Sequence, residues 1–92
     1  VSGRIADAMG DIISRLSENM QVVAITHLPQ VASKGESHFV VYKQDSRTNI
    51  SRLGEDDRIT EIAKMLSGSE ITAAALSQAR ILLGVQPKST LF

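Results

Sequence analysis

Apolar residues recur every three or four positions in the first part of the chain, which is the spacing that places side chains on one face of a helix. The sequence therefore predicts an amphipathic helix over residues 2–20. Its apolar positions are Ile5, Met9, Ile12, Ile13, Leu16 and Met20. Gly10 lies in the middle of this helix, where glycine costs about 1 kcal/mol relative to alanine. We expect a neighbouring element to pack closely against Gly10 and offset that cost.

The apolar positions become continuous at residues 21–26, QVVAIT. A continuous apolar run is typical of a strand that is buried on both faces of a parallel sheet. A helix followed by such a strand is half of a parallel β-α-β unit. The strand that would precede the helix is absent, and the chain begins with Val1 rather than methionine. We therefore expect the chain to be a piece of a longer protein.

The remaining pattern predicts a short helix, an antiparallel hairpin and two further helices. Pro29 suits the first position of a helix, and Gly35 suits its end. Polar residues 45–47 form the turn of the hairpin, and Ser69 is a suitable cap for the last helix. In chain order we expect a helix over 29–33, strands over 38–44 and 48–53, and helices over 55–66 and 70–83.

The apolar stripes of the last two helices indicate the core. They comprise Ile59, Ile62, Ala63, Leu66, Ile71, Ala75, Leu76, Ala79, Leu82 and Leu83. The methionines at positions 9, 20 and 65 are also expected in the core. The predicted class is α/β, with residues 1–84 as one unit and residues 85–92 as a flexible tail.

Composition narrows the classes of function. The chain has 92 residues, of which 42% are hydrophobic, and its formal net charge is zero. Proteins that bind nucleic acids usually carry a basic surface, so this chain is a poor candidate for the main contact with DNA. The absence of cysteine excludes disulfides and cysteine zinc sites, and no apolar run approaches the length of a membrane span. We expect a cytoplasmic protein.

His27 is the candidate catalytic residue. Thr26 and His27 stand at the carboxyl end of the expected buried strand, and ligands of open α/β sheets bind outside the carboxyl ends of the strands. A histidine at that place can donate a hydrogen bond towards a bound phosphate or its attacking water. The alternative is a histidine that is satisfied by the local backbone or exposed in a loop.

Three stretches of the chain resemble one known family. Residues 21–33, QVVAITHLPQVAS, closely resemble the segment after the Walker B motif in the SMC-like, ABC-type ATPases that act in bacterial DNA repair. The opening residues VSGRIA look like the stretch just past the Walker B and D-loop residues, and residues 58–68 resemble the C-terminal helix motif. The resemblance covers about residues 1–84 and implies part of a P-loop ATPase head.

In that family two heads enclose ATP and Mg²⁺, so the resemblance implies that His27 is the switch histidine that senses the γ-phosphate and helps to place the hydrolytic water. Ser2 and Gly3 would lie near the nucleotide or the head–head interface, although a plain helix N-cap explains them equally well. The implied parent acts in double-strand-break repair on DNA, as a homodimer associated with the bacterial nucleoid.

Two motifs of the family are missing from this chain. The sequence contains neither a Walker A loop, G-x-x-x-x-G-K-[ST], nor a strand that ends in the Asp-Glu pair of Walker B. Without them nothing cradles the phosphates or holds Mg²⁺. We expect the chain alone to have no cofactor and no ATPase activity, and to self-associate through the open edges of the strand at 21–26. The alternative is a stand-alone α/β binding or oligomerisation module without catalysis.

Other polar residues have simpler interpretations. His38 is expected at the surface or in a cross-strand position rather than at a metal. The acidic run at residues 55–57 favours the dipole of the helix that it opens, rather than a cation site. For Arg58 we favour an ion pair with a neighbouring carboxylate over a contact with phosphate. No metal site is predicted.

Overall fold

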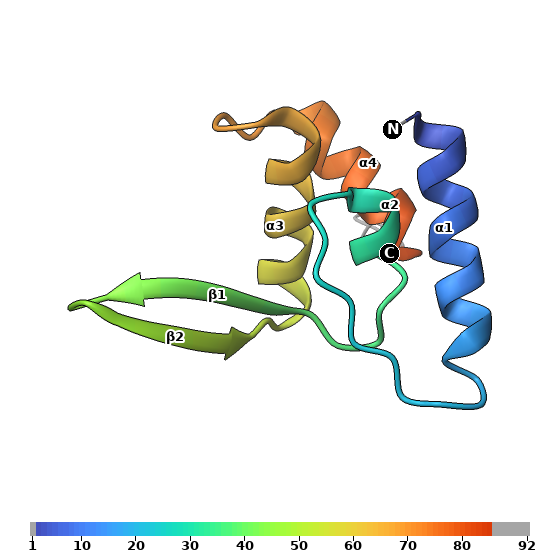
Figure 1. Ribbon diagram of the computed structural model, residues 1–92. Helices are drawn as coiled ribbons and strands as arrows, with labels where there is room; N and C mark the ends of the chain where they lie inside the picture. Colours follow the sequence, from blue (N-terminus) through green and yellow to red (C-terminus); the bar gives the residue numbers. More distant parts are fainter. Residues whose placement is uncertain (1, 86–92) are drawn as a thin grey trace, which may run out of the picture.

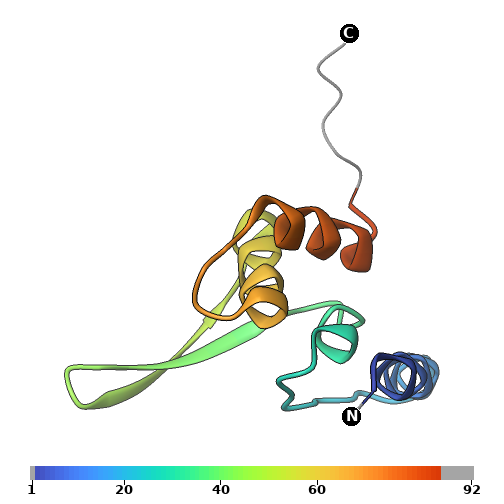
Figure 2. The same ribbon diagram turned by 90° about the horizontal axis from the view of Figure 1, so that it is seen from above.

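The computed structural model describes residues 2–85, so the expected tail, apart from Val85, lies outside the described residues. The elements are α1 (Gly3–Leu16), α2 (Pro29–Ala32), β1 (Phe39–Gln44), β2 (Arg47–Arg52), α3 (Glu55–Ser67) and α4 (Ala73–Leu83). Helix α1 lies beside α2, α3 packs on α4, and the hairpin projects away from the helices (Figures 1 and 2). The expected α/β class is confirmed in this small form. Within residues 2–85 the sheet has two antiparallel strands, and no parallel sheet forms.

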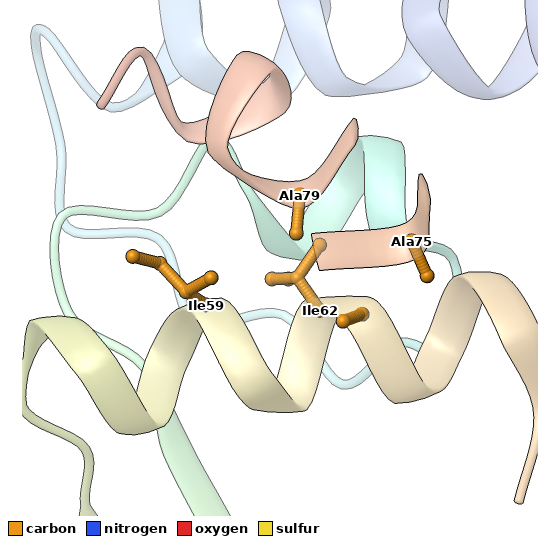
Figure 3. Packing of buried hydrophobic residues seen from close by; sticks show 5 residues of the cluster. Ile59, Ile62, Ala75 and Ala79 are labelled. Atoms are coloured by element: carbon orange, nitrogen blue, oxygen red, sulfur yellow. The ribbon is translucent and has the colours of Figure 1, made fainter. Parts of the chain in front are cut away.

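The core lies between α3 and α4, as the two apolar stripes predicted, although Leu66 and Ile71 are exposed and the prediction is wrong for these two residues. Ile62, Ala63 and Ala79 are completely buried there, and Ile59 and Ala75 complete the cluster (Figure 3). Small alanine side chains on α4 let the two helices approach closely around Ile62. Complete burial of one such isoleucine stabilises the fold by roughly 1.5–3 kcal/mol. Met65 packs against this cluster, whereas Met9 and Met20 are exposed, so the prediction that they are core residues is wrong.

Residues 21–26 do not form the expected buried strand. They are an irregular connection between α1 and α2, in which Val23 and Ile25 expose 83% and 102% of their surfaces. A strand requires a neighbour that satisfies its backbone hydrogen bonds, and the two strands of the described chain pair with each other. The apolar run therefore stays unpaired and exposed, and the prediction of a buried strand is wrong for this structure.

Helix α1 ends at Leu16 rather than at Met20. Residues 17–20 form turns, in which the Glu18 amide donates to the Arg15 carbonyl at 3.2 Å and the Asn19 amide donates to the Leu16 carbonyl at 3.2 Å. Serine and asparagine side chains compete with helical backbone bonds and favour turns, which explains the early end.

Helix α4 begins later than expected. Its cap is Thr72, whose hydroxyl oxygen accepts a hydrogen bond from the Ala75 amide at 3.0 Å, so the prediction that Ser69 caps this helix is wrong. Gly68 leaves α3 with φ +79°, a conformation that favours glycine and directs residues 69–71 into a loop. The Ser67 hydroxyl donates to the Glu70 carbonyl and holds this loop against the end of α3.

The hairpin forms with a tighter turn than expected. Asp45 and Ser46 alone connect β1 to β2, with φ values of 52° and 63°. Two successive residues with positive φ are typical of the type I′ turn, whose twist matches that of the strands. Val41 and Ile50 face each other across the strands, and both side chains are largely exposed.

Gly10 packs closely on α2, as predicted. A Cβ atom at this position would lie 2.8 Å from the backbone oxygen of Gln30 and 3.1 Å from Cγ of Lys34. Real Cβ atoms do not approach a backbone oxygen so closely, so only glycine permits this spacing of α1 and α2. Among the helices of the described chain, none is long and apolar enough to cross a lipid bilayer.

We predict that Gly10→Ala destabilises the chain, because the new methyl group must push α2 away from α1. Overpacking costs about 1–3 kcal/mol and the gain in helix propensity returns about 1 kcal/mol, so a net loss of roughly 1 kcal/mol is expected in urea unfolding. Gly3→Ala is the matched control in the same helix, since its Cβ would lie 3.6 Å from Nε2 of Gln30, an ordinary contact. Equal stabilities of the two variants would contradict the packing argument.

Candidate functional site

His27 lies in the loop between α1 and α2 with its side chain exposed. The hydroxyl oxygen of Thr26 accepts a hydrogen bond from the Leu28 amide at 3.0 Å, which closes a small turn around His27. In the described structure, His27 therefore occupies an exposed loop, which is the alternative that the sequence left open. The expected position at the end of a parallel strand is not found, because that strand does not form.

Helix α2 fixes the chain directly after His27. Its N-cap is Leu28, whose carbonyl accepts from the Val31 and Ala32 amides at 3.0 and 2.9 Å. Pro29 is the first helical residue and is buried, as is Val31. The bend at His27 therefore leads directly into α2, which is anchored by the buried side chains of Pro29 and Val31. The imidazole ring of His27 itself is exposed and can contact a ligand.

Ser2 and Gly3 begin α1. The Ser2 side chain accepts a hydrogen bond from the Ile5 amide at 3.2 Å, which is the geometry of a helix N-cap. Gly3 is the first residue of the helix and lies near the side chain of Gln30 on α2. The N-cap explanation of Ser2 is confirmed, and a place for either residue at a nucleotide or head–head interface stays a prediction.

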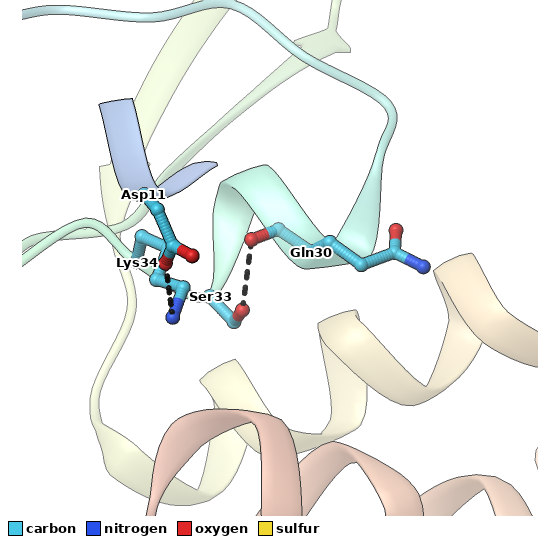
Figure 4. Close-up of polar contacts among 4 residues, drawn as sticks. All are labelled: Asp11, Gln30, Ser33 and Lys34. Atoms are coloured by element: carbon cyan, nitrogen blue, oxygen red, sulfur yellow. Dashed lines mark hydrogen bonds and ion pairs between the residues drawn. The ribbon is translucent and has the colours of Figure 1, made fainter. Parts of the chain in front are cut away.

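One ion pair joins the segment just after α2 to α1, and one hydrogen bond closes the end of α2 itself (Figure 4). Nζ of Lys34 lies 3.1 Å from Oδ1 of Asp11, and the Ser33 hydroxyl donates to the Gln30 carbonyl at 3.3 Å. Both partners of the ion pair are well exposed, so it contributes at most about 1 kcal/mol. The close contact at Gly10 therefore determines the position of α1 more than this ion pair does.

Arg58, on the first turn of α3, does not form the expected ion pair with any carboxylate among residues 2–85. Its Nη2 donates to the carbonyl oxygens of Ala32 at 3.1 Å, Ser33 at 3.3 Å and Gly35. These carbonyls lie at or just after the C-terminal end of α2. Carbonyl oxygens at the end of a helix have no amide partner within the helix and carry the negative end of its dipole. The guanidinium donates to these carbonyl oxygens, which carry partial negative charge and take the place of the expected carboxylate partner. The contact joins α3 to the segment that follows His27.

His38 and Arg58 line a pocket of about 230 Å³ that the sequence did not indicate. It lies between the base of the hairpin, the start of α3 and the end of α4, with Arg52, Glu55 and Leu83 among its other walls. The Nδ1 atom of His38 and the Nε atom of Arg58 are buried in the described structure without a hydrogen-bond partner. Twenty positions separate the two residues, so no local pattern could reveal their proximity.

The environment of this pocket lowers two pKa values. Burial lowers the pKa of His38 below its model-peptide value of 6.5, the positive charge of Arg58 lowers it further, and Glu61 acts in the opposite direction. Burial also lowers the pKa of Arg58. His38 is partly buried and lies just before β1, and its carbonyl accepts a hydrogen bond from the Leu53 amide at 2.8 Å, so of the two expected positions the cross-strand one is confirmed. A neutral ring is therefore favoured at this place.

The acidic run opens α3 as predicted. Glu55, Asp56 and Asp57 occupy its first turn, where negative charge interacts favourably with the helix dipole. Among residues 2–85, no group of three or more potential metal-ligating side chains comes together.

Apolar side chains cover much of the surface near the His27 loop. One face of α1 is exposed, and so is the loop that follows it. The exposed residues are Ile5, Met9, Ile12 and Leu16 on the helix and Met20, Val23 and Ile25 beyond it. Globular proteins rarely leave so many large apolar side chains in one continuous segment without a covering partner.

The chain is similar to known bacterial proteins. No family model matches the chain. Its sequence is nevertheless homologous to bacterial proteins of DNA repair, with 41% identity to a protein of Rickettsia typhi and 39% identity to one of Haemophilus influenzae, each over 90% of this chain. A protein of Mycobacterium leprae is 39% identical over 96% of the chain.

Each of these relatives bears the name DNA repair protein RecN. The chain is homologous to a C-terminal segment of RecN, which confirms the resemblance seen in its residues. It spans 16% of the length of the Rickettsia and Haemophilus proteins and 15% of the Mycobacterium protein.

The lowered pKa of His38 predicts a pH-dependent stability. The folded chain binds fewer protons than the unfolded chain when the pH lies near or below 6.5, so the free energy of unfolding should fall as the pH falls through that range. His38→Gln, which cannot titrate, should flatten this dependence in urea unfolding between about pH 8 and pH 5. The matched control is His27→Gln in the exposed loop. A slope unchanged in His38→Gln would contradict the assignment.

Proposed function

We propose that this chain is part of the ATPase head of a DNA repair protein of the SMC-like, ABC-type class, and that His27 acts in that head on the terminal phosphate of ATP. The observation that supports this most strongly is the homology to RecN across 90% of the chain. Because the chain spans about one sixth of those relatives, the activity belongs to the complete protein.

The position of His27 suits a donor to phosphate. Its ring is exposed, the Thr26–Leu28 turn defines the backbone around it, and α2 follows immediately. A preorganised donor stabilises the charge that develops on the γ-phosphoryl oxygens without reorganising during the reaction. In this proposal the imidazole donates to a γ-phosphate oxygen or orients the attacking water.

This chain would contribute a donor rather than the nucleotide-binding site itself. It has neither Walker motif, and the side chains of residues 2–85 form no metal cluster. ATP and Mg²⁺ would be bound by residues outside this chain, and a second copy of the head would close the site. Contacts with DNA would also lie elsewhere, because the chain carries no net charge.

The exposed apolar loop fits the same proposal. Residues 21–26 have the composition of a buried strand, yet Val23 and Ile25 are largely exposed in this chain. Parallel strands contributed by the rest of the head would supply the missing hydrogen bonds and cover both faces. His27 would then stand at the carboxyl end of a parallel strand, where ligands of such sheets bind.

We predict that His27→Ala in the complete protein lowers ATP turnover much more than ATP binding. Removal of one preorganised donor costs about 10²–10³-fold in kcat, while the Kd for ATP should change less than about threefold, because the donor acts mainly in the transition state. Steady-state turnover and equilibrium binding of ATP, with and without DNA, measure the two effects.

The control is Gln44→Ala at the end of β1, which also trims an exposed polar side chain to a methyl group. It should leave both turnover and binding unchanged. Normal turnover in His27→Ala would exclude His27 from the mechanism, and parallel losses of binding and turnover would point to a general role in binding.

The exposed apolar surface also favours the second candidate function, an association module. Residues 21–26, which would join a sheet in the complete head, have unpaired backbone groups in this chain, and a second copy of the chain could pair with them. Strand pairing or exchange between two copies would cover Val23 and Ile25 without any catalysis.

We predict that the chain by itself forms dimers or larger species as its concentration rises, as measured by sedimentation velocity. Ile25→Lys should shift it towards the monomer, because a charge cannot be buried in the paired strand. Ile81→Lys on α4 is the control, since this side chain is also exposed but lies on another helix. A clean monomer at high concentration would count against association through this loop.

A further inference from the structure

Arg58 makes an unusual connection between distant parts of the chain. Its Nη2 reaches the carbonyls of Ala32, Ser33 and Gly35, which precede it by 26, 25 and 23 positions. All three acceptors lie at or just after the end of α2, and Arg58 itself is on the first turn of α3. One side chain therefore joins α3 to the end of a helix that starts directly after the His27 loop.

The residue type is well matched to this task. Charged donors form hydrogen bonds about twice as strong as those of neutral donors, and the C-terminal end of a helix attracts positive charge. The connection carries a cost, because burial lowers the pKa of Arg58 and leaves its Nε atom without a partner in the described structure. An apolar side chain would avoid that cost, so simple packing does not explain an arginine here.

The path from Arg58 to His27 is short and rigid. The amides of Val31, Ala32 and Ser33 donate to carbonyls at the start of α2, so its single turn is fully bonded. Pro29 and Val31 are buried, and Leu28 is tied to Thr26. When the end of α2 is held, the bend that carries His27 has little freedom to shift relative to α3 and α4.

We propose that Arg58 is a positioning residue for ATP hydrolysis: it holds α2 by its carbonyl end and thereby fixes the place of His27. This rests on the function proposed for His27. A displacement of a catalytic group by about 1 Å can cost on the order of 10²-fold in rate, so loss of the anchor should slow turnover even though Arg58 contacts no substrate.

The test uses the complete protein with Arg58→Met, which keeps the apolar stem, and Arg58→Lys, which keeps the charge but replaces the guanidinium by a shorter ammonium group. In Arg58→Met we expect amide hydrogen exchange over residues 31–34 to accelerate, and kcat to fall about 10-fold while the KM for ATP changes less than about threefold. Arg58→Lys should lie between Arg58→Met and the unsubstituted protein. Arg47→Met, on an exposed residue at the start of β2, is the matched control and should change neither quantity.

A double-mutant cycle with His27→Ala separates positioning from general stability. If Arg58 acts through His27, Arg58→Met should reduce the residual turnover of His27→Ala no further. An equal fold-loss in both backgrounds would overturn the proposal, as would normal kcat in Arg58→Met despite faster exchange over residues 31–34. Unchanged exchange in Arg58→Met would disprove the anchor itself. Normal turnover in His27→Ala would instead remove the proposed function, and with it the role of Arg58 in turnover.

Discussion

The hydrogen bonds from Arg58 to the end of α2 join the two helical parts of the described chain, together with the packing of Ala32 against the α3–α4 core. On one side α3 and α4 form a core around Ile62, and on the other α1 contacts the rest of the molecule mainly through α2. Gly10 allows α1 to lie directly on the backbone of α2. The position of α1, and of the loop with His27, therefore depends on how firmly α2 is attached to α3. Arg58 contributes charged hydrogen bonds to this attachment, and Ala32 contributes apolar contact with the α3–α4 core.

The distribution of apolar residues explains why so small a core is accompanied by so much exposed apolar surface. The α3–α4 cluster consists of isoleucine and alanine side chains, whereas the larger apolar residues of α1 and of the following loop remain at the surface. A chain of this size buries only about 60–65% of the surface that it exposes when unfolded, so its margin of stability is small. The chain is homologous to about one sixth of the length of the RecN proteins, and the function proposed above gives this exposed surface a partner within an ATPase head.

The candidate site was predictable only where the signal was local. His27 is predicted because a polar pair follows an apolar run and because residues 21–33 resemble a known family, and its catalytic role stays a prediction. Ser2 is predicted because a serine before an apolar helix is a typical cap, and the structure confirms that cap. The sequence does not predict the carbonyl contacts of Arg58 or the partly buried position of His38. The hairpin lies between them in sequence, and its closure brings the residue before β1 next to the first turn of α3. An arginine that binds backbone carbonyls leaves no pattern in the sequence, because its partners are atoms that every residue possesses.

Local physics in the sequence determined the helices and the hairpin: the apolar periodicity of α1, α3 and α4, the proline that starts α2, and the polar turn between β1 and β2. These features depend on residues that lie within a few positions of one another, so they can be predicted directly from the sequence. Residues 21–26 show the limit of that information. Their composition suits a buried strand, but a strand exists only when another strand accepts and donates its backbone hydrogen bonds. Tertiary structure alone decides whether that neighbour is present, and it also decided which arginine would hold α2 in place.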